Sequence, residues 1–346
     1  MQLELFDYNL PEEQLAYYPA KQRDASKLMS LDRATGQIGH HKFSEIIDFL
    51  NPGDALVINN TRVFKARLRA RRETGGRVEV FLLEEIKHEG KISWLVLTHP
   101  TRRIKEGEQL YVGEFDSFEL VAKRDDGKSI IRFKSRSEAD RIINRYGNVP
   151  LPIYIHREPD KEDEERYQTV YSLTTKDKSV AAPTAGLHFT DQILDRIKEK
   201  GIKIIPITLH VGYGTFKSVK SENIEDHIVD PEFAEISKSS AKAINRIRAE
   251  GGKIVAVGTT SVRTLESANI VNGEIQPLSD YVHLYIRPGY EFKVVDRLIT
   301  NFHLPKSSLI ILVSAFAGRE KILEAYNEAV KNGYRFYSYG DCMVIT

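Results

Sequence analysis

The spacing of hydrophobic residues changes twice along this chain, and each change predicts a different kind of structure. Near the start, FSEIIDFLNPGDALVINN has a mixed apolar and polar segment, then Pro52 and Gly53, then an unbroken apolar run. This order predicts a helix with Ser44 as its N-cap, a break at the proline and glycine, and a buried strand over residues 55–59.

From about residue 61 to residue 149 the pattern becomes short runs rich in β-branched and aromatic residues. RVEVFLLEEI, ISWLVLTH, FELVAKR and SIIRFK are examples, and the turn-like sequences TGG, HEGK, KEGE and DDGK separate such runs. Short strands at regular intervals are typical of a small all-β barrel or sandwich. We therefore expect an all-β domain in this region.

After a charged segment at residues 157–166, helical periodicity alternates with short apolar runs. TDQILDRIKEKG, with Thr190 as N-cap, precedes IKIIPITLHVG; SKSSAKAINRIRAEGG precedes KIVAVGTT; and EKILEAYNEAVKNG precedes YRFYSYGDCMVI. LIILVSAFAG is too short to span a membrane and is expected to be a buried element. The pattern predicts an α/β core built from both chain ends, residues 1–61 and 150–346, with residues 62–149 as an inserted all-β, barrel-like domain.

The composition narrows the classes of protein. The chain has 346 residues, of which 41% are hydrophobic, so it is long enough for two domains with buried cores. Its formal net charge is +1, which excludes a uniformly basic nucleic-acid binder and leaves room only for a local basic patch. The single cysteine, Cys342, excludes a disulfide framework and a cysteine-based zinc site. With no readable signal peptide or membrane span, we expect a cytoplasmic protein.

One local basic patch is present in the predicted all-β domain. Lys65, Arg67, Arg69 and Arg71 alternate with apolar residues, which places four cations on one face of a strand. A solvated strand face is the ordinary interpretation of such a pattern. Four like charges in a row repel one another unless a polyanion meets them, so we favour contact with nucleic-acid phosphates.

Three neutral stretches are candidates for a ligand site. They are SVAAPTAGLHFT (residues 179–190), LHVGYGTF (209–216) and VGTTSVRTLES (257–267). Ligands of α/β sheets bind at the carboxyl ends of the strands, so we expect these stretches to lie along one edge of the sheet. Each also has a plainer explanation as a packing turn, a glycine turn, or a helix start capped by Thr260 or Ser261.

Motifs of several enzyme classes are absent from the chain. LHVGYGTF lacks the third glycine of a dinucleotide fingerprint and the Gly-Lys-Ser/Thr of a phosphate-binding loop. HExxH, close Cys/His clusters and a Gly-x-Ser-x-Gly elbow are missing as well, which argues against metal and serine hydrolase sites. The residues alone thus predict a two-domain protein with a pocket in its α/β core and a basic strand, but they do not predict a reaction.

A set of stretches taken in order along nearly the whole chain is more specific. They are FDYNLPEEQLAYYPAKQRDASKLM, DALVINNTRVFKARL, YQTVYS, SVAAPTAGLHFT, LHVGYGTF, AVGTTSVRTLES, LITNFHLPKSSLIILVSAFAG and YRFYSYGD. Together they resemble the S-adenosylmethionine:tRNA ribosyltransferase-isomerase family of queuosine biosynthesis, with PTAGLHFT and TNFHLP the most specific. The chain departs from the family pattern at Ser218, where proline is usual, and at Asp230, where a second histidine is usual.

The resemblance implies a reaction and its partners. S-adenosylmethionine would donate its ribosyl group to 7-aminomethyl-7-deazaguanine at the wobble position of tRNA. The products would be epoxyqueuosine-tRNA, adenine and methionine. S-adenosylmethionine is then a consumed substrate, and no metal or added cofactor is implied. The family fold, an α/β core with an inserted β-barrel, agrees with the predicted organisation.

For this reaction we expect proton transfer by His188 or His210, because an imidazole titrates near neutral pH, with Glu232 and Asp341 as further candidates. The expected substrate-binding residues are Asn60, Arg62, Pro183, Thr184, Ala185, Gly186, Gly212, Gly214, Thr215, Thr259, Thr260, Ser261, Arg263, Asn301 and His303. Ala185 and Gly186 are expected to let adenosine approach the backbone. The expected tRNA-binding residues are Lys65, Arg67, Arg69 and Arg71, and no metal ligand is expected.

Two other functions remain open on the sequence alone. An S-adenosylmethionine-dependent RNA methyltransferase would form S-adenosylhomocysteine in place of adenine and methionine. A non-catalytic RNA-binding module would bind tRNA without turnover. The balanced charge and the absence of heptad repeats favour a monomer.

Overall fold

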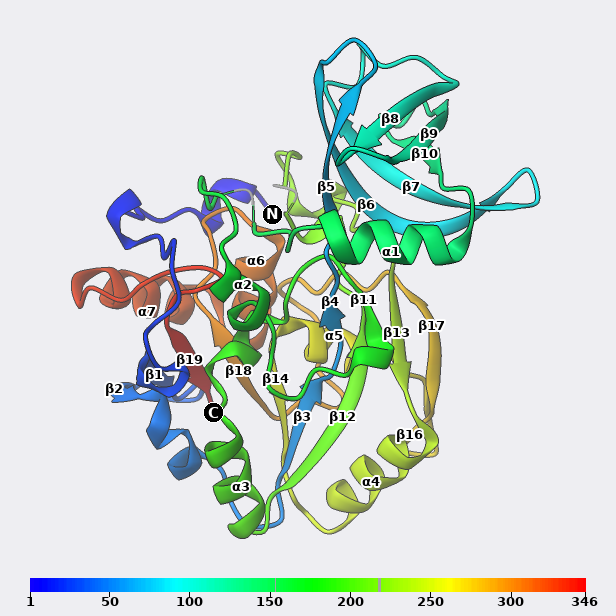
Figure 1. Cartoon of the computed structure of the whole chain (residues 1–346). Coiled ribbons are helices and arrows are strands. Elements are labelled where there is room, and N and C mark those ends of the chain that lie inside the picture. The colour runs from blue at the N-terminus through cyan, green and yellow to red at the C-terminus, as the bar shows by residue number, and fades with distance from the viewer. Residues whose placement is uncertain (153, 217–218) are drawn as a thin grey trace.

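The structure is a computed structural model that describes residues 1–152, 154–216 and 219–346. It has two main parts, an α/β core and a β-barrel, and Figure 1 shows the barrel above one end of the core. Strands from the two ends of the chain, β1 (Lys27–Leu31) and β19 (Cys342–Ile345), pair in parallel within the core sheet. The predicted core built from both chain ends, with an inserted barrel, is therefore confirmed. The family departure at Ser218 lies outside the described residues.

Among the described residues, nine strands form the core sheet. In spatial order they are β17 (Leu278–Val282), β13 (Glu232–Ile236), β12 (Lys203–Leu209), β3 (Ala55–Asn59), β14 (Ile254–Val257), β18 (Arg297–Asn301), β19, β1 and β2 (Ile38–Lys42). The four strands β12, β3, β14 and β18 run parallel to one another, so their carboxyl ends lie along one edge. Antiparallel neighbours on either side make the sheet mixed.

Helices cover both faces of this sheet. The described α-helices are α1 (Arg136–Tyr146), α2 (Lys161–Arg166), α3 (Asp191–Glu199), α4 (Lys238–Ala249), α5 (Thr259–Ser267), α6 (Ser308–Ala317) and α7 (Arg319–Lys331). Ala55 and Val57 of β3 pack in a cluster with α4 to α7, whereas Leu56 and Ile58 pack in a second cluster with α3 and the 3-10 helix Phe43–Phe49. Because side chains alternate along a strand, each buried strand needs cover on both faces.

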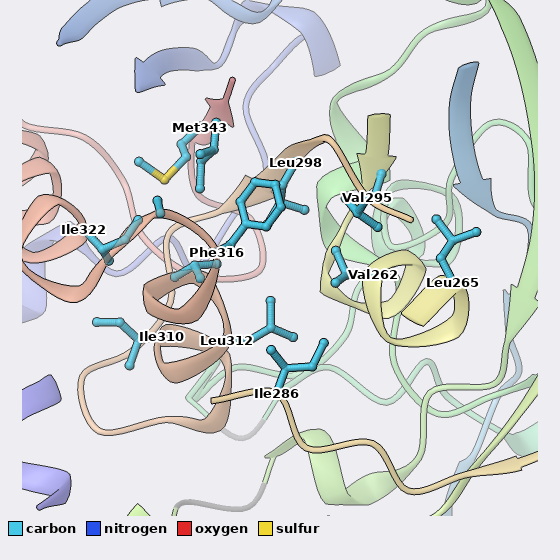
Figure 2. Close-up of a cluster of buried hydrophobic side chains, with 14 of the residues drawn as sticks. Val262, Leu265, Ile286, Val295, Leu298, Ile310, Leu312, Phe316, Ile322 and Met343 are labelled. Carbon is cyan, nitrogen blue, oxygen red and sulfur yellow. The ribbon is translucent and has the colours of Figure 1, made fainter. Parts of the chain in front are cut away.

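The predicted buried element LIILVSAFAG is the apolar helix α6. Figure 2 shows Ile310, Leu312 and Phe316 of this helix in a cluster with side chains of α5, α7 and β18. Ile286, from the segment after β17, lies beside Leu312 in the same view. The predicted cap of α3 is also confirmed, because the Thr190 hydroxyl accepts a hydrogen bond from the amide of Ile193 (3.2 Å).

Six strands of the described chain close the barrel. They are β5 (Arg67–Arg72), β6 (Arg77–His88), β7 (Lys91–His99), β8 (Glu108–Val112), β9 (Asp116–Lys123) and β10 (Ser129–Arg132). In β5, Leu68 and Ala70 are buried in the barrel, whereas Arg69 and Arg71 are exposed, so the predicted alternation is confirmed within this strand; Lys65 lies before it, so the four cations do not share one strand. No pattern predicted α1, which packs Ile142 into the barrel cluster and lies between the barrel and the core in Figure 1.

Shorter pairings complete the fold. β4 (Arg62–Val63) pairs with β11 (Asp177–Ser179) outside the barrel, and β15 (Ile270–Val271) pairs with β16 (Glu274–Ile275). The barrel strands run from Arg67 to Arg132, and the predicted domain limits at residues 62 and 149 stay a prediction.

Two predictions of local capping are wrong. Ser44 does not cap the first predicted helix: that segment is a 3-10 helix that begins at Phe43, whose amide bonds to the carbonyl of Ser26, so Ser44 lies inside the first turn. Neither Thr260 nor Ser261 caps α5, which starts directly after Gly258 without a capping side chain.

Cys342 is fully buried in β19, with β18 on one side and β1 on the other. Its thiol is free, and burial raises the pKa of that thiol. Among the helices of the described residues, none combines the length and the apolar character needed to cross a membrane.

Candidate active site

The edge where the parallel strands end carries the stretches that the sequence singled out. β12 ends before His210, β14 ends before Gly258, and β18 ends at Asn301, two residues before His303. The segment from residue 181 to the 3-10 helix Thr184–His188 lies against this edge, because that helix contacts β18. The expectation that the neutral stretches meet at one edge is confirmed.

Residues of these stretches help to line a pocket that is partly open to solvent, which we call the edge pocket. Its lining is Tyr167, Ala181, Ala182, Pro183, Thr184, Ala185, Val211, Gly258, Thr259, Thr260, Thr300, Asn301, His303, Leu309, Tyr337 and Ser338. Gly258 has a φ of +84°, which favours glycine at the turn into α5. The Thr260 hydroxyl is buried and has no hydrogen-bond partner among the described residues. Gly186 is outside this lining, and a side chain there would collide with Tyr171, so its small size serves packing.

The Asn301 side chain joins three segments around the edge pocket. Its Nδ2 group donates to the carbonyl oxygens of Tyr337 (2.9 Å) and Ser338 (3.3 Å). Its Oδ1 atom lies 3.1 Å from Nε2 of His188 and can only accept, so Nε2 of His188 carries the proton. The other ring nitrogen, Nδ1, then accepts from the hydroxyl of Ser26 at 2.7 Å.

His188 is a neutral, buried residue behind the wall of the edge pocket. It is 5% exposed, and burial lowers its pKa to about 4. It lines a separate small hollow together with Arg23, Arg166 and Arg335. Any proton transfer by this imidazole requires one of its two hydrogen bonds to open.

The imidazole that lines the edge pocket is that of His303. Its Nε2 lies 3.0 Å from the hydroxyl of Thr300, and burial lowers its pKa to about 3. His210 lies outside both pocket linings: its Nδ1 is 2.8 Å from the hydroxyl of Thr61, its ring stacks on Phe233, and burial, with two nearby lysines, lowers its pKa to about 4. Within the described part of the chain, no group of three metal-ligating side chains is close enough to hold an ion.

A second pocket adjoins the first, and we call it the Arg263 pocket. Leu309 lines both pockets, and α5 contributes Thr260 to the edge pocket and Arg263 to the other. The remaining lining of the Arg263 pocket is Gly214, His227, Ile228, Val229, Asp230, Glu232, Leu284, Tyr285, Ile286, Ser308 and Leu312. Arg263 Nη1 pairs with Glu232 Oε2, and Glu232 Oε1 accepts from the amide of Gly212 at 2.9 Å.

Comparison with known proteins identifies the family, which the geometry alone does not. A family model described as "Queuosine biosynthesis protein" matches residues 3–345. The chain belongs to this family. Two curated relatives, from Acetivibrio thermocellus and Clostridium kluyveri, are named S-adenosylmethionine:tRNA ribosyltransferase-isomerase, and each is 48% identical over 347 residues, with 100% of both chains covered.

A solved structure is similar as well. The crystal structure of S-adenosylmethionine tRNA ribosyltransferase from Thermotoga maritima is 36% identical, covers 99% of this chain and 100% of its own, and has a TM-score of 0.55. The resemblance that the sequence motifs predicted is confirmed, and so is the classification of the protein as an enzyme.

The two pockets of this queuosine biosynthesis protein contain part of the predicted set. The edge pocket contains Pro183, Thr184, Ala185, Thr259, Thr260, Asn301 and His303, and the Arg263 pocket contains Gly214, Glu232 and Arg263. Neither lining includes Asn60, Arg62, Gly186, His188, His210, Gly212, Ser261 or Asp341. Thr215 belongs to the 3-10 helix Tyr213–Phe216, and its side chain is outside the described part. The functional role of every one of these residues stays a prediction.

Several residues of the second group have structural partners. The carboxylate of Asp341 accepts hydrogen bonds from the amides of Lys27 (3.0 Å) and Arg335 (2.8 Å). The hydroxyl of Ser261 donates to the backbone carbonyl four residues earlier. Asn60 is buried and accepts from a threonine hydroxyl of β12. These bonds hold the backbone of the strand ends in place.

Sequence reasoning missed part of both linings. Tyr167, Tyr337 and Ser338 line the edge pocket and belong to the stretches YQTVYS and YRFYSYGD. Because both stretches carry the family resemblance, these residues could have been predicted as part of the site. His227 and Tyr285 line the Arg263 pocket, and no motif pointed to Tyr285.

The basic residues at the start of the barrel face outward, but three of the four have acidic partners. The ion pairs are Lys65–Glu164 (2.9 Å), Arg67–Glu79 (3.9 Å) and Arg69–Glu158. Glu158 and Glu164 belong to the charged segment at α2, so two of these pairs connect the barrel to the core. Arg71 is exposed and has no ion pair among the residues that the structure describes.

The buried histidines predict that folding depends on pH. The pKa of His303 falls from its ordinary value of 6.5 to about 3 in the folded protein, so the unfolded chain binds more protons between these values. Lowering the pH from about 7.5 to about 5 should therefore cost ~2 kcal/mol of unfolding free energy for each such histidine. Urea unfolding at the two pH values measures this loss. The loss of unfolding free energy should be smaller in a His303→Gln variant. An equal loss in the variant would contradict the assignment.

Proposed function

We propose that this enzyme transfers and isomerises the ribosyl group of S-adenosylmethionine onto 7-aminomethyl-7-deazaguanine at the wobble position of tRNA. The products are epoxyqueuosine-tRNA, adenine and methionine. One observation carries the proposal: the stretches on which the family resemblance rests supply most of the lining of the edge pocket, namely Pro183, Thr184, Ala185, Gly258, Thr259, Thr260, Thr300, Asn301, His303, Tyr337 and Ser338.

The lining of the edge pocket suits a nucleoside. Pro183 and Ala185 have small side chains, so a planar purine can lie against the backbone there. α5 starts without a side-chain cap, which leaves its first amides available to a ligand oxygen. The unpartnered hydroxyl of Thr260 offers a further hydrogen bond to a ribose hydroxyl or a ring nitrogen.

The reaction requires a base and a route for a proton to adenine. The positive sulfonium acidifies C5′ of the ribose, and a base removes a proton from that carbon to give an ylide. The amine of the tRNA base attacks C1′, and adenine leaves with a proton. The sugar then rearranges to the epoxycyclopentanediol while the bond between sulfur and C5′ breaks and methionine departs. One proton is released overall.

Two buried imidazoles are our candidates for proton transfer. Both His188 and His303 are neutral at pH 7, because burial lowers their pKa to about 4 and about 3, and a neutral imidazole can accept a proton. His303 lines the edge pocket directly, whereas His188 contacts it through Asn301. Glu232 and Asp341 are weaker candidates, since Arg263 and two backbone amides already engage their carboxylates.

The first prediction for the proposed function concerns its products. Purified enzyme, S-adenosylmethionine and precursor tRNA should yield adenine and methionine in equal amounts, with no added metal or cofactor, as measured by chromatography. S-adenosylhomocysteine in place of adenine would identify a methyltransferase. Binding of tRNA without any turnover would identify an RNA-binding module.

The second prediction concerns His188. If it transfers a proton, His188→Asn should lower single-turnover adenine release by about 100-fold or more at saturating tRNA. Ser26→Ala is the matched control, because it removes one hydrogen bond to the same ring but keeps the imidazole. A loss below about tenfold in the His188 variant would contradict an acid or base role.

The third prediction concerns the basic strand. We propose that Lys65, Arg67, Arg69 and Arg71 contact tRNA phosphates, which requires the phosphates to replace Glu158 and Glu164. The quadruple alanine variant should bind tRNA more weakly and with a shallower dependence on salt. The pair Glu158→Gln and Glu164→Gln should instead bind more tightly, since the competing charges are gone. An unchanged salt slope in the quadruple variant would overturn the assignment.

A further inference from the structure

We infer that the Arg263 pocket recognises the amino-acid part of S-adenosylmethionine, with Arg263 and Tyr285 binding its carboxylate. This inference rests on the proposed function, in which S-adenosylmethionine is the substrate. It adds the position of the methionine part of that substrate. The starting observation is a pair of buried donors. Arg263 Nη2 and the Tyr285 hydroxyl each lack a hydrogen-bond partner among the described residues, and both side chains line the pocket.

Two unpartnered hydrogen-bond donors in one pocket indicate that a bound ligand supplies an acceptor. A buried donor without a partner costs free energy, so such groups in a folded protein point to a ligand that satisfies them. Arg263 Nη1 is already held by Glu232, which fixes the guanidinium and leaves Nη2 available. A carboxylate matches a guanidinium edge and a phenol hydroxyl better than a neutral acceptor does, because hydrogen bonds between charged groups are stronger.

The same pocket also contains two carboxylates, whose negative charge favours an ammonium group. Glu232 and Asp230 both line it. A side chain at Gly214 would collide with the carboxylate of Asp230, so the glycine is what allows this acid to approach the chain at that point. Donors and carboxylates in one small pocket form the complement of a zwitterion, in which an ammonium and a carboxylate share one carbon.

The apolar part of the lining fits the chain between the zwitterion and the sulfonium. Ile286 and Leu312 line the pocket, and Figure 2 shows that both also belong to the buried hydrophobic cluster, so this wall is well packed. The methylene groups of a methionyl chain can lie on such a wall.

Continuity with the edge pocket favours one ligand that spans both. Leu309 lines the two pockets, and Thr260 and Arg263 lie one turn apart on α5. A molecule with its adenosine in the edge pocket therefore has its sulfonium tail directed into the Arg263 pocket. A flat tRNA base is the competing occupant, because the rings of Tyr285 and His227 also line the pocket. We favour the methionyl chain because the two unpartnered donors match a carboxylate and the wall of Leu284, Leu309 and Leu312 is aliphatic.

The test compares S-adenosylmethionine with its decarboxylated form, which lacks only the carboxylate. By isothermal titration, the wild-type enzyme should bind the intact compound at least about tenfold more tightly, the usual effect of a hydrogen bond to a charged group. Tyr285→Phe should weaken binding of the intact compound by about tenfold and leave the decarboxylated compound unchanged. Arg263→Lys, which keeps a cation beside Glu232, should reduce the preference in the same direction.

Tyr281→Phe is the matched control. Tyr281 is on β17, donates to Glu84 of the barrel and lines neither pocket, so its loss should leave the preference for the carboxylate intact. Equal binding of both compounds by the wild type, or an equal loss for both in Tyr285→Phe, would overturn the inference. A Tyr285→Phe variant that keeps the preference for the carboxylate but binds precursor tRNA more weakly would also overturn the inference, because the pocket would then bind the tRNA base. A selective enzyme that releases no adenine would contradict the proposed function alone.

Discussion

The hydrogen bonds of the Asn301 side chain are the interaction on which the site depends. One amide group fixes the end of β18, the 3-10 helix that carries His188, and the backbone at Tyr337 and Ser338. Each of these segments contributes to the wall of the edge pocket. Because the groups involved are buried, losing one partner would cost about 1–3 kcal/mol, so the three segments keep one arrangement. The pocket therefore has a fixed wall before any ligand binds.

Much of the fold could be predicted because its information is local. The periodicity of α3 and α4, the apolar runs of β12 and β14, and the alternation along β5 are all properties of neighbouring residues. The helix α1 was missed because it interrupts a region otherwise composed of strands and buries few of its residues. The start at Phe43 was missed because Lys42, which is not a typical capping residue, takes the cap position: its amide donates to the side chain of Glu45 (3.1 Å), and the amide of Phe43 bonds to the carbonyl of the distant Ser26.

The candidate site could be predicted only in part, for the same physical reason. Small residues and glycines at strand ends are visible in the sequence, and they led to the correct edge of the sheet. The environment of His188 was not visible, because its partners Ser26 and Asn301 are 162 and 113 residues away. The charge of the basic strand was visible, but its neutralisation by Glu158 and Glu164 depends on how α2 lies against the barrel.

The position of Cys342 has a consequence for studying this protein. Its thiol is fully buried between two strands of the sheet, and its raised pKa keeps it protonated at neutral pH. Only a thiolate in contact with solvent reacts with a labelling reagent. Labelling can therefore occur only when β19 separates from its neighbours. The rate at which this one native thiol is modified thus measures how often the central sheet opens.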